Sequence, residues 1–390
     1  MSRDVPVDAL LLGPDVASGE VEYAEKTGDW LRTSTRLIDG PHVALLRSVA
    51  GSGNAPDDGA LRDSAYMRQG MKCIAAFGRF HEATDEASLV RLAREFIAVH
   101  AGSRGLAGGD GTVPGRSRPG SLPVVRRIWG SDRFQILDGH HRLASAAARG
   151  ERTVRVYVKS KPAYTSAQRL ILDVESTRHR PALYQPVELP EMGEGWPLRR
   201  RCTDRLEMIR AFMSDRGLLG PRPDGSARTS LDVACNYGWF VARFRAMGIR
   251  AHGVEIDPAA LKVGRVLYGN SDADVTCRDG VEFLRSVSTP YDAVTCFSLA
   301  HHFVLGRGPC SAEELMRLLD KACGAVMFFD TGQDHERWFR EKLKGWDVDK
   351  VESWLRETTT FREIVRLGVD QDDVGVTAEN YRRTLFALVR

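Results

Sequence analysis

SLDVACNYGWF, at residues 230–240, is a short apolar run that ends at Asp232 and then breaks into small, turn-forming residues. This pattern predicts a strand, a tight turn and the start of a helix. Backbone N–H groups at such a helix start, reached by a turn with little side-chain bulk, suit a nucleotide-like ligand that lies close to the main chain. Glu255 ends the next apolar run, IRAHGVE, where an acidic side chain is placed to hold ribose hydroxyls.

Strand and helix patterns alternate regularly after this stretch. The expected strands are 231–234, 251–255, 275–278, 291–298 and 325–330, and the expected helices are 239–247, 257–269, 281–287, 311–323 and 334–344. Such alternation requires a parallel sheet with right-handed crossovers. The last two apolar runs, FREIVRLG and RTLFALVR, have no helical pattern between them, so we expect them to pair as an antiparallel edge.

A nicotinamide enzyme would need G-x-G-x-x-G after the first strand, whereas this chain has Ala234, Asn236 and Gly238 in the order D-x-A-x-N-x-G. Over about residues 200–390 the chain instead resembles the class I S-adenosylmethionine-dependent methyltransferase fold. The resemblance rests on LDVACNYGWF, GVEIDP, the pair Asp279-Gly280, YDAVTCFSLAHHF and the terminal hairpin. It implies an α/β fold with a doubly wound, seven-stranded Rossmann-like sheet whose last strand is antiparallel. It also implies S-adenosylmethionine as cofactor, although the family usually has glycine where Ala234 stands.

The same resemblance implies which residues bind the cofactor. From the methionine end to the adenine end they are Asp232, Ala234, Asn236, Gly238, Glu255, Ile256, Asp279 and Gly280, together with Ser298 after the fourth strand. In this assignment Glu255 takes the ribose hydroxyls, Asp279 lies at the adenine edge and Ile256 covers the adenine face. Each has a structural alternative, since Asp279 can cap a helix and Ile256 can belong to the core.

His301 and His302 follow the fourth strand, where residues of this architecture face the methyl group. Methyl transfer is an in-line displacement, so the protein must hold the nucleophile at about 3–3.5 Å and remove its proton when necessary. Histidine titrates near neutral pH, and we predict that at least one of the two acts as a general base or contacts the substrate. Packing of the helix start is the alternative. Gln333, with Asp334 and His335, is a second substrate-binding candidate.

A second strand, turn and helix are predicted between residues 134 and 158. RFQIL ends at Asp138, DGHHRLASAAARG supplies a turn and an alanine-rich helix, and TVRVYV is a further strand. This order is similar to the ParB/sulfiredoxin-like domain, in which a G-x-H-R turn binds nucleotide phosphates and some members are small-molecule kinases. The cysteine that sulfiredoxin needs is replaced by His140, so sulfinic-acid chemistry is not expected.

The residues implied to hold a nucleotide, phosphate or substrate are Asp138, Gly139, His140, His141 and Arg142. Arg142 beside a helix N-terminus is a physical basis for an anion site. Pairing of Asp138 with Arg142 across the turn, with both histidines partly buried, is an equal alternative. The resemblance covers about residues 4–160. We therefore expect a smaller α+β ParB/sulfiredoxin-like domain at 1–160, a helical connector at 161–200 and the methyltransferase domain at 201–390.

Elsewhere in the N-terminal half, the patterns predict a strand at 6–12, helices at 43–49, 63–77 and 87–99, and a solvated loop at 102–120. In and after the connector we expect helices at 166–178 and 202–217. Tyr184, Gln185 and Trp196 are candidates for a lid over the following site, with packing as the simpler account. The densest basic cluster, Arg199, Arg200, Arg201 and Arg205, is expected to be a solvated helix start rather than an RNA contact.

The composition bounds the class of protein. With 390 residues, 43% hydrophobic and 27% charged, the chain can build two globular domains. A net charge of +3 is too small to imply a polyanionic partner. The seven cysteines include no CxxC pair, which indicates free thiols in a reducing cytoplasm, and no metal site is predicted. No apolar run predicts a signal peptide or a membrane span.

We therefore expect a cytoplasmic S-adenosylmethionine-dependent methyltransferase that acts on O or N of a polar small-molecule metabolite. The first domain would help to hold this substrate, and two anion-capable turns in one chain favour a phosphorylated or nucleotide-linked one. Methylation of RNA or protein is the first alternative, with nucleic acid not favoured as a partner. The second is a nucleotide-binding or kinase-like module whose methyltransferase domain only senses the cofactor.

Overall fold

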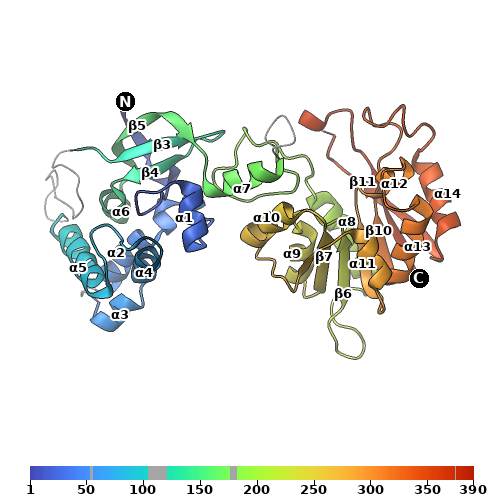
Figure 1. Cartoon of the computed structure of the whole chain (residues 1–390), viewed down its shortest axis with the longest axis horizontal. Coiled ribbons are helices and arrows are strands. Elements are labelled where there is room, and N and C mark those ends of the chain that lie inside the picture. Colours follow the sequence, from blue (N-terminus) through green and yellow to red (C-terminus); the bar gives the residue numbers. More distant parts are fainter. Residues whose placement is uncertain (53–55, 104–120, 176–181, 374) are drawn as a thin grey trace. The chain divides into compact units, whose positions relative to one another are not determined.

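The computed structural model describes residues 1–52, 56–103, 121–175, 182–373 and 375–390 (Figure 1). The chain divides into two compact units, one of Met1–Leu172 and Glu188–Trp196, the other of Asp173–Val187 and Pro197–Arg390. The segment 161–200, expected as a connector, is thus shared between both units. Among the described residues, every helix is too short or too polar to cross a membrane.

The first unit is an α+β fold around a five-stranded sheet of order β1-β5-β3-β4-β2. Its strands are β1 (Ser2–Pro6), β2 (Leu10–Leu11), β3 (Val124–Ile128), β4 (Phe134–Asp138) and β5 (Thr153–Ala163). The helices up to the second unit are α1 (Glu20–Thr27), α2 (Pro41–Ser52), α3 (Asp58–Arg62), α4 (Ala65–Phe77), α5 (Glu86–Ser103), α6 (His140–Ala148) and α7 (Ser166–Glu175). Figure 1 shows α2, α4 and α5 gathered on one side of this sheet, beyond α6.

Two expectations for the first unit are corrected. The strand expected at 6–12 is interrupted by a 3₁₀ turn, Val7–Ala9, in which the N–H of Leu10 donates to the carbonyl of Val7. The helix expected at 63–77 starts later, at the Ser64 cap, whose hydroxyl accepts the N–H of Met67. From residue 104 on, the loop expected at 102–120 lies outside the described residues.

The second unit contains a seven-stranded sheet of order β11-β12-β10-β9-β6-β7-β8. Its strands are β6 (Thr229–Val233), β7 (Arg250–Glu255), β8 (Val275–Cys277), β9 (Tyr291–Cys296), β10 (Cys323–Phe329), β11 (Glu363–Val369) and β12 (Thr384–Val389). Its helices after α7 are α8 (Thr203–Asp215), α9 (Trp239–Ala246), α10 (Pro258–Tyr268), α11 (Gly280–Ser286), α12 (Ala300–Val304), α13 (Ala312–Ala322) and α14 (Val348–Thr358). β6 to β10 pair in parallel and β12 is antiparallel to both β10 and β11, which confirms the doubly wound sheet and its terminal hairpin.

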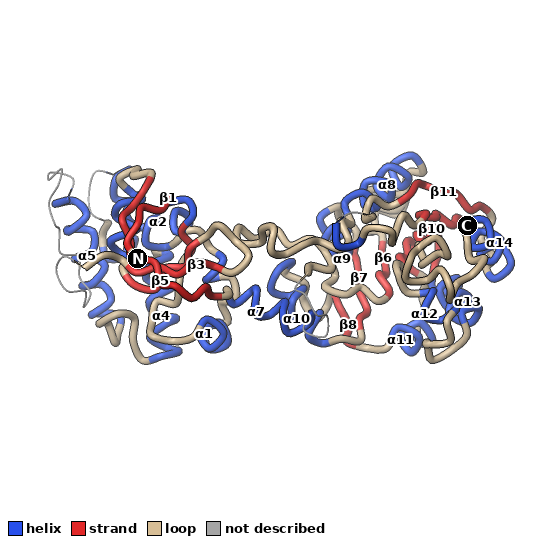
Figure 2. The backbone as a smooth tube through the Cα atoms, turned by 90° about the horizontal axis from the view of Figure 1, so that it is seen from above, coloured by secondary structure: helices blue, strands red, loops and turns tan. Residues whose placement is uncertain are grey.

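Helices cover both faces of this sheet, as the alternation of side chains along each strand requires. Along β10, Val326 and Phe328 join the cluster that contains residues of α8, α9 and α10. Met327 and Phe329 join the cluster that contains residues of α11, α13 and α14. Figure 2 shows α8 and α9 on one side of the strands and α11 and α13 on the other. The carboxyl ends of β6, β7, β9 and β10 therefore share one edge of the sheet.

The prediction of a helix at 334–344 is wrong. These residues form turns, in which Asp334 accepts the N–H of Gly345 (3.1 Å) and Glu336 pairs with Arg383 (2.8 Å). Side chains that hold distant backbone and side-chain groups compete with a regular helix. The helix lies further on, as α14, where Asp347 caps the first turn by accepting the N–H of Lys350.

Candidate functional site

The turn after β6 has an uncommon backbone. Ala234, Asn236 and Gly238 have φ values of 59°, 54° and 76°, in the left-handed region. Such a conformation strains a residue with a Cβ by about 1–3 kcal/mol, and this strain concentrates at ligand sites. A Cβ on Gly238 would lie 2.6 Å from Nδ2 of Asn270, so only glycine fits there. The main chain consequently comes close to whatever occupies the edge of the sheet.

Two polar atoms beside this turn are buried without a hydrogen-bond partner among the described residues: Oδ2 of Asp232 and Oδ1 of Asn236. The other oxygen of Asp232 accepts the hydroxyl of Thr295 at 2.7 Å. Burial raises the pKa of Asp232 to about 7. Unpaired buried oxygens are costly, and their presence at this turn fits a ligand with hydrogen-bond donors or positive charge.

A cavity of about 90 Å³ brings together the residues expected at the ribose and adenine: Glu255, Ile256, Asp279 and Gly280, with Ala234 at its boundary. Ile256 is 65% exposed and is therefore not a core residue. Oδ1 of Asp279 caps α11 by accepting two backbone N–H groups at 2.9 and 3.0 Å. The capping alternative for Asp279 is thus observed, in a residue that also lines the cavity.

The carboxylate of Glu255 organises the turn as well as facing the cavity. Its Oε2 accepts the N–H of Asn236 at 2.9 Å, and its Oε1 accepts the N–H groups of Ile256 and Asp257 at 2.8 and 3.0 Å. One side chain therefore fixes the positions of the first and second strand ends relative to each other.

A second, smaller cavity of about 30 Å³ also has Ala234 in its lining, with Tyr184, Asp232, Arg205 and Ser298. Ser298 follows β9 and is left-handed, with φ of 56°. The two cavities thus place all expected cofactor residues along the carboxyl edge of the sheet, except Asn236 and Gly238, which shape the turn itself.

The three residues expected to form a lid lie in different places. Gln185 is buried; its Nε2 donates to the carbonyl of Cys235 (3.2 Å) and its Oε1 accepts the N–H of Trp239 (3.3 Å), so it holds the turn in place. Tyr184 lines the smaller cavity. Trp196 belongs to the first unit, where it packs edge-on against Trp129 with ring centres 5.7 Å apart.

His301 and His302 occupy different environments on α12. His301 is buried, and its Nδ1 accepts the N–H of Gly332 at 3.2 Å. Burial, with the charge of Arg383, lowers the pKa of His301 to about 2, so its imidazole is a neutral, weakly basic acceptor. This geometry argues against His301 as a general base. His302 is exposed, with its ring 4.3 Å from that of His301.

The prediction of a solvated basic cluster is wrong for two of its four arginines. Arg200 and Arg205 are 1% and 2% exposed, and each donates to Oδ2 of Asp330 at 3.0 Å. Arg200 also pairs with Asp370 and Asp372 at 3.0 and 3.2 Å. Burial by itself would raise the pKa of Asp330, but Arg200 and Arg205 hold it at about 2. The solvated helix start that the sequence indicated is therefore a buried ionic network.

Asp330 was not predicted as part of this region, although it ends the apolar run AVMFFD at the same edge of the sheet. Its Oδ1 accepts the N–H of Ser298 at 2.8 Å, which links the ionic network to the cavity. Arg383 donates to Oγ of Ser298 (2.9 Å) and makes a two-pronged pair with Glu336 (2.8 Å each). Gln333 is buried, and its backbone N–H donates to Glu336 at 2.9 Å.

In the first unit the turn before α6 also contains a left-handed glycine, Gly139, with φ of 90°. His140 and His141 are buried; the Nε2 of His140 accepts the N–H of Gly13 at 3.1 Å, and the Nε2 of His141 lies 2.8 Å from the Tyr66 hydroxyl. Arg142 pairs with Asp138 at 3.3 Å. The pairing alternative is thus observed, and neither histidine faces solvent.

Part of the chain resembles known proteins. Residues 231–328 match the family model described as "Methyltransferase domain". No curated protein matches the chain. A solved structure of the bifunctional kinase-methyltransferase WbdD is 18% identical, with a TM-score of 0.43, over 56% of this chain and 46% of that one. The chain therefore spans about half the length of this relative.

Two further solved structures are similar. A SAM dependent methyltransferase from Archaeoglobus fulgidus is 16% identical over 47% of this chain and 94% of that one, with a TM-score of 0.33. The N-methyltransferase NodS from Bradyrhizobium japonicum WM9, in complex with S-adenosyl-L-homocysteine, is 14% identical over 48% and 85%, with a TM-score of 0.34.

The matched residues run from β6 into β10, the part of the sheet whose carboxyl edge carries both cavities. The unpaired oxygens of Asp232 and Asn236 fit the ammonium and hydroxyl donors of S-adenosylmethionine. Residues 231–328 of the second unit thus form a methyltransferase domain, and the polar edge of its sheet suits S-adenosylmethionine as the methyl donor.

Proposed function

We propose that the enzyme transfers a methyl group from S-adenosylmethionine to an oxygen or nitrogen of a polar small-molecule metabolite. One observation carries the choice of a small molecule over RNA: Arg200 and Arg205, from the cluster that favoured RNA, are buried and paired with Asp330. Buried, paired guanidinium groups are not available to neutralise phosphates. A cavity of about 30 Å³ at the methionine end suits a small polar acceptor group.

For the cofactor, we assign its amino-acid end to Asp232 and Asn236, whose buried oxygens lack partners among the described residues. Glu255 would take the ribose hydroxyls, and Asp279, Gly280 and Ile256 the adenine, since all four line one cavity. The cofactor supplies a methyl group on a sulfonium centre. The chain's own task is to position the acceptor and to remove its proton.

For proton removal we propose His302. It is the exposed member of the pair, while His301 uses its Nδ1 for the N–H of Gly332. Ser298 and Tyr184 line the smaller cavity and are proposed to contact the acceptor. Gln333 lies buried after β10. We propose that its backbone N–H, which donates to Glu336, helps to shape the loop beside the site.

We propose that the first unit is a ParB/sulfiredoxin-like module that holds a phosphorylated or nucleotide-linked part of the substrate. A cavity of about 320 Å³ there is lined by Ser121, Arg142, Thr153 and Arg155. Arg142 and the start of α6 would provide the anion contacts. The histidines of the motif are buried, so this proposal rests on Arg142 and the backbone instead.

The test uses the full chain with labelled S-adenosylmethionine and three acceptor pools: a metabolite extract, total RNA and protein. Transfer to the metabolite pool alone supports the proposal. Transfer to RNA with steeply salt-dependent binding, or to protein, contradicts it. The absence of transfer to all pools, with cofactor still bound, would instead favour a cofactor-sensing domain.

The role of the first unit is tested separately with Arg142→Ala. We expect KM for the metabolite to rise with little change in kcat, because Arg142 would contribute binding without touching the reacting atoms. Arg149→Ala is the matched control, since Arg149 pairs with Glu151 at 2.7 Å near the far end of the same helix. Equal KM values for wild type and Arg142→Ala would remove the proposed role.

A further inference from the structure

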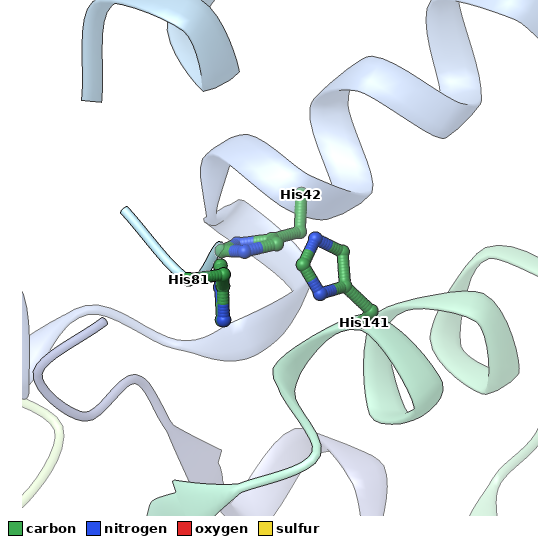
Figure 3. A group of neighbouring side chains, drawn as sticks. All are labelled: His42, His81 and His141. Carbon is green, nitrogen blue, oxygen red and sulfur yellow. The ribbon is translucent and has the colours of Figure 1, made fainter. Parts of the chain in front are cut away.

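Three imidazoles converge in the core of the first unit (Figure 3). His42 lies in the first turn of α2, His81 in the turn between α4 and α5, and His141 in the first turn of α6. One ring nitrogen from each lies within 4.8 Å of those of the other two. Figure 3 shows the three rings turned toward one another from these separate segments. No sequence pattern predicts this group, because its members are far apart in the chain.

The nitrogens of this group lack ordinary partners. His42 is fully buried, and neither its Nδ1 nor its Nε2 has a hydrogen-bond partner among the described residues. The same holds for Nε2 of His81. A buried polar atom without a partner costs about 1–3 kcal/mol. Aromatic packing against Tyr66 and Phe96 accounts for the ring of His42 but leaves its nitrogens unsatisfied. An ion at the centre of the group would bind one nitrogen of each ring.

The backbone of His81 supports a role beyond packing. Its φ is 50°, a left-handed conformation that a residue with a Cβ adopts only at a cost. The turn is closed by Phe80 and Ala83, which exchange two backbone hydrogen bonds of 2.8 and 3.0 Å. A short turn between two helices thus holds a strained residue whose side chain faces two other histidines.

Groups of the kind that orient metal-binding histidines are also present. A ligating imidazole usually has its second nitrogen bonded to a nearby polar group, which fixes the ring. The Tyr66 hydroxyl lies 2.8 Å from Nε2 of His141. Oδ1 of Asp15 lies 4.0 Å from Nε2 of His42 and is held by Arg32 at 2.7 Å. Two of the three rings therefore have a candidate orienting partner.

We propose that His42, His81 and His141 bind a divalent transition-metal ion of the zinc class. Three neutral nitrogen ligands suit zinc, cobalt or nickel and do not suit magnesium or calcium, which prefer oxygen. Tetrahedral coordination with bonds of about 2.0–2.1 Å brings the nitrogens to about 3.4 Å from one another. The nitrogens lie within 4.8 Å of one another, so the group closes by up to about 1.4 Å on binding, with His81, the half-buried ligand on a turn, placed to move most.

Three protein ligands leave a fourth coordination position for water or for an oxygen of a bound molecule. Catalytic zinc sites have three protein ligands and an open position, whereas closed structural sites have four protein ligands. The proposal is limited to metal binding and is independent of methyl transfer by the second unit.

The experiment loads the purified full chain with Zn²⁺, removes loose metal on a desalting column and measures bound zinc by elemental analysis. We expect about one ion per chain. His81→Ala and His42→Asn should retain several-fold less zinc. His100→Asn, which changes a buried imidazole of α5 outside the group, should retain as much as wild type. Co²⁺-loaded wild type should show the intense visible absorption of tetrahedral cobalt, and His81→Ala should not.

Folding is monitored in the same samples. Zn²⁺ should raise Tm of the first unit in wild type and in His100→Asn, because an ion that binds only the native state stabilises it. It should not do so in His81→Ala, whose altered residue lies on a turn and leaves the core helices in place. Zinc retention by His81→Ala equal to that of wild type would overturn the proposal. So would wild type that neither retains zinc nor shows the cobalt spectrum, and this outcome requires no variant to fold.

Discussion

Each unit of the molecule places two adjacent histidines at the start of a helix that follows a strand. The first histidine of each pair has the same structural role, whereas the second histidines differ in their surroundings. His140 accepts the N–H of Gly13 at 3.1 Å, and His301 accepts the N–H of Gly332 at 3.2 Å. In both cases a buried imidazole ties a separate loop to the helix. The second histidine differs: His141 faces the core, whereas His302 is exposed. In each His-His pair the first histidine is therefore structural, and the role of the second depends on whether it faces the core or the solvent.

The acidic residues at two strand ends, Asp138 before α6 and Asp232 before α9, also differ in their surroundings. Asp138 is exposed and pairs with Arg142, so its charge is satisfied by its own turn. Asp232 is buried, and one of its oxygens has no partner among the described residues. A carboxylate that pairs within its own turn needs no further partner, whereas a buried carboxylate oxygen without a partner is suited to bind a ligand. Local sequence does not show that Asp232 is buried, because the groups that cover it come from elsewhere in the fold.

The largest expected effect concerns the ion pairs near the two histidine pairs. Asp330→Ala would leave Arg205 with only the longer ion pair to Asp372 among the described residues, at 3.6 Å, and Asp15→Ala would remove the carboxylate that lies 2.7 Å from Arg32. Because removal of one buried partner leaves an uncompensated charge, we expect each change to destabilise its own unit by about 3–5 kcal/mol. Urea unfolding measures this loss.

Arg216→Ala is the control, because Arg216 and Glu363 form an exposed pair and its loss should leave the midpoint unchanged. The pH dependence has a definite sign. The pKa of Asp330 is about 2 in the native protein and lies below its usual value of 3.8, so its contribution is complete above pH 3.8 and is lost as the pH falls toward 2. A native state of Asp330→Ala as stable as wild type would show that the network is not required.

The second prediction separates the two members of the C-terminal pair. His302→Asn should lower kcat by about 100-fold or more if His302 removes the acceptor proton, with the cofactor affinity retained. His301→Leu should mainly reduce stability, by about 1–3 kcal/mol, because the N–H of Gly332 loses its acceptor. Steady-state kinetics and urea unfolding of both variants measure the difference. Unchanged kcat in His302→Asn, with a large loss in His301→Leu that is not explained by unfolding, would reverse the assignment.

The third prediction concerns the contrast between Asp232 and Asp138. Burial raises the pKa of Asp232 to about 7, so the carboxylate is partly protonated near neutral pH in the free protein. The ammonium group of S-adenosylhomocysteine favours the charged form of Asp232, so affinity for this ligand should rise as the pH increases through about 7. Asp232→Asn should bind about tenfold to hundredfold more weakly and lose this pH dependence.

Asp138→Asn is the control for Asp232→Asn and should leave both the affinity and its pH profile as in wild type. Calorimetric titration between pH 6 and 8 distinguishes the outcomes, with the range chosen around the pKa of about 7. A profile of Asp232→Asn that still rises with pH would assign the titrating group elsewhere.

The smallest effect is expected at the two turn glycines. Gly238→Ala and Gly139→Ala each place a Cβ on a left-handed residue, which costs about 1–2 kcal/mol. The added Cβ would also lie 2.6 Å from Nδ2 of Asn270 and 2.9 Å from Cβ of Pro123, respectively. Only Gly238→Ala should weaken cofactor binding. Gly248→Ala has the same backbone strain with no neighbour within 4 Å and gives the strain alone in thermal unfolding.

Much of the C-terminal fold could be predicted because its signals are local. Apolar runs that end in Asp232 and Glu255, helices between them and a final pair of runs without a helix were enough for the order and direction of the strands. The failure at 334–344 came from distant contacts. At 334–344 the residues contact distant partners, including Arg383, and no sequence pattern records such contacts.

The sequence by itself determined the two strand–turn–helix segments and the residues at their turns, because strand period, glycine and helix caps act over a few neighbours. Only the tertiary structure decided which charges are buried. Arg200 and Arg205 read as a solvated cluster until Asp330 and Asp370, more than a hundred residues away, were placed against them. It also brought His42, His81 and His141 together from three segments. Burial and pairing are properties of the folded chain, since they depend on groups that only folding makes neighbours.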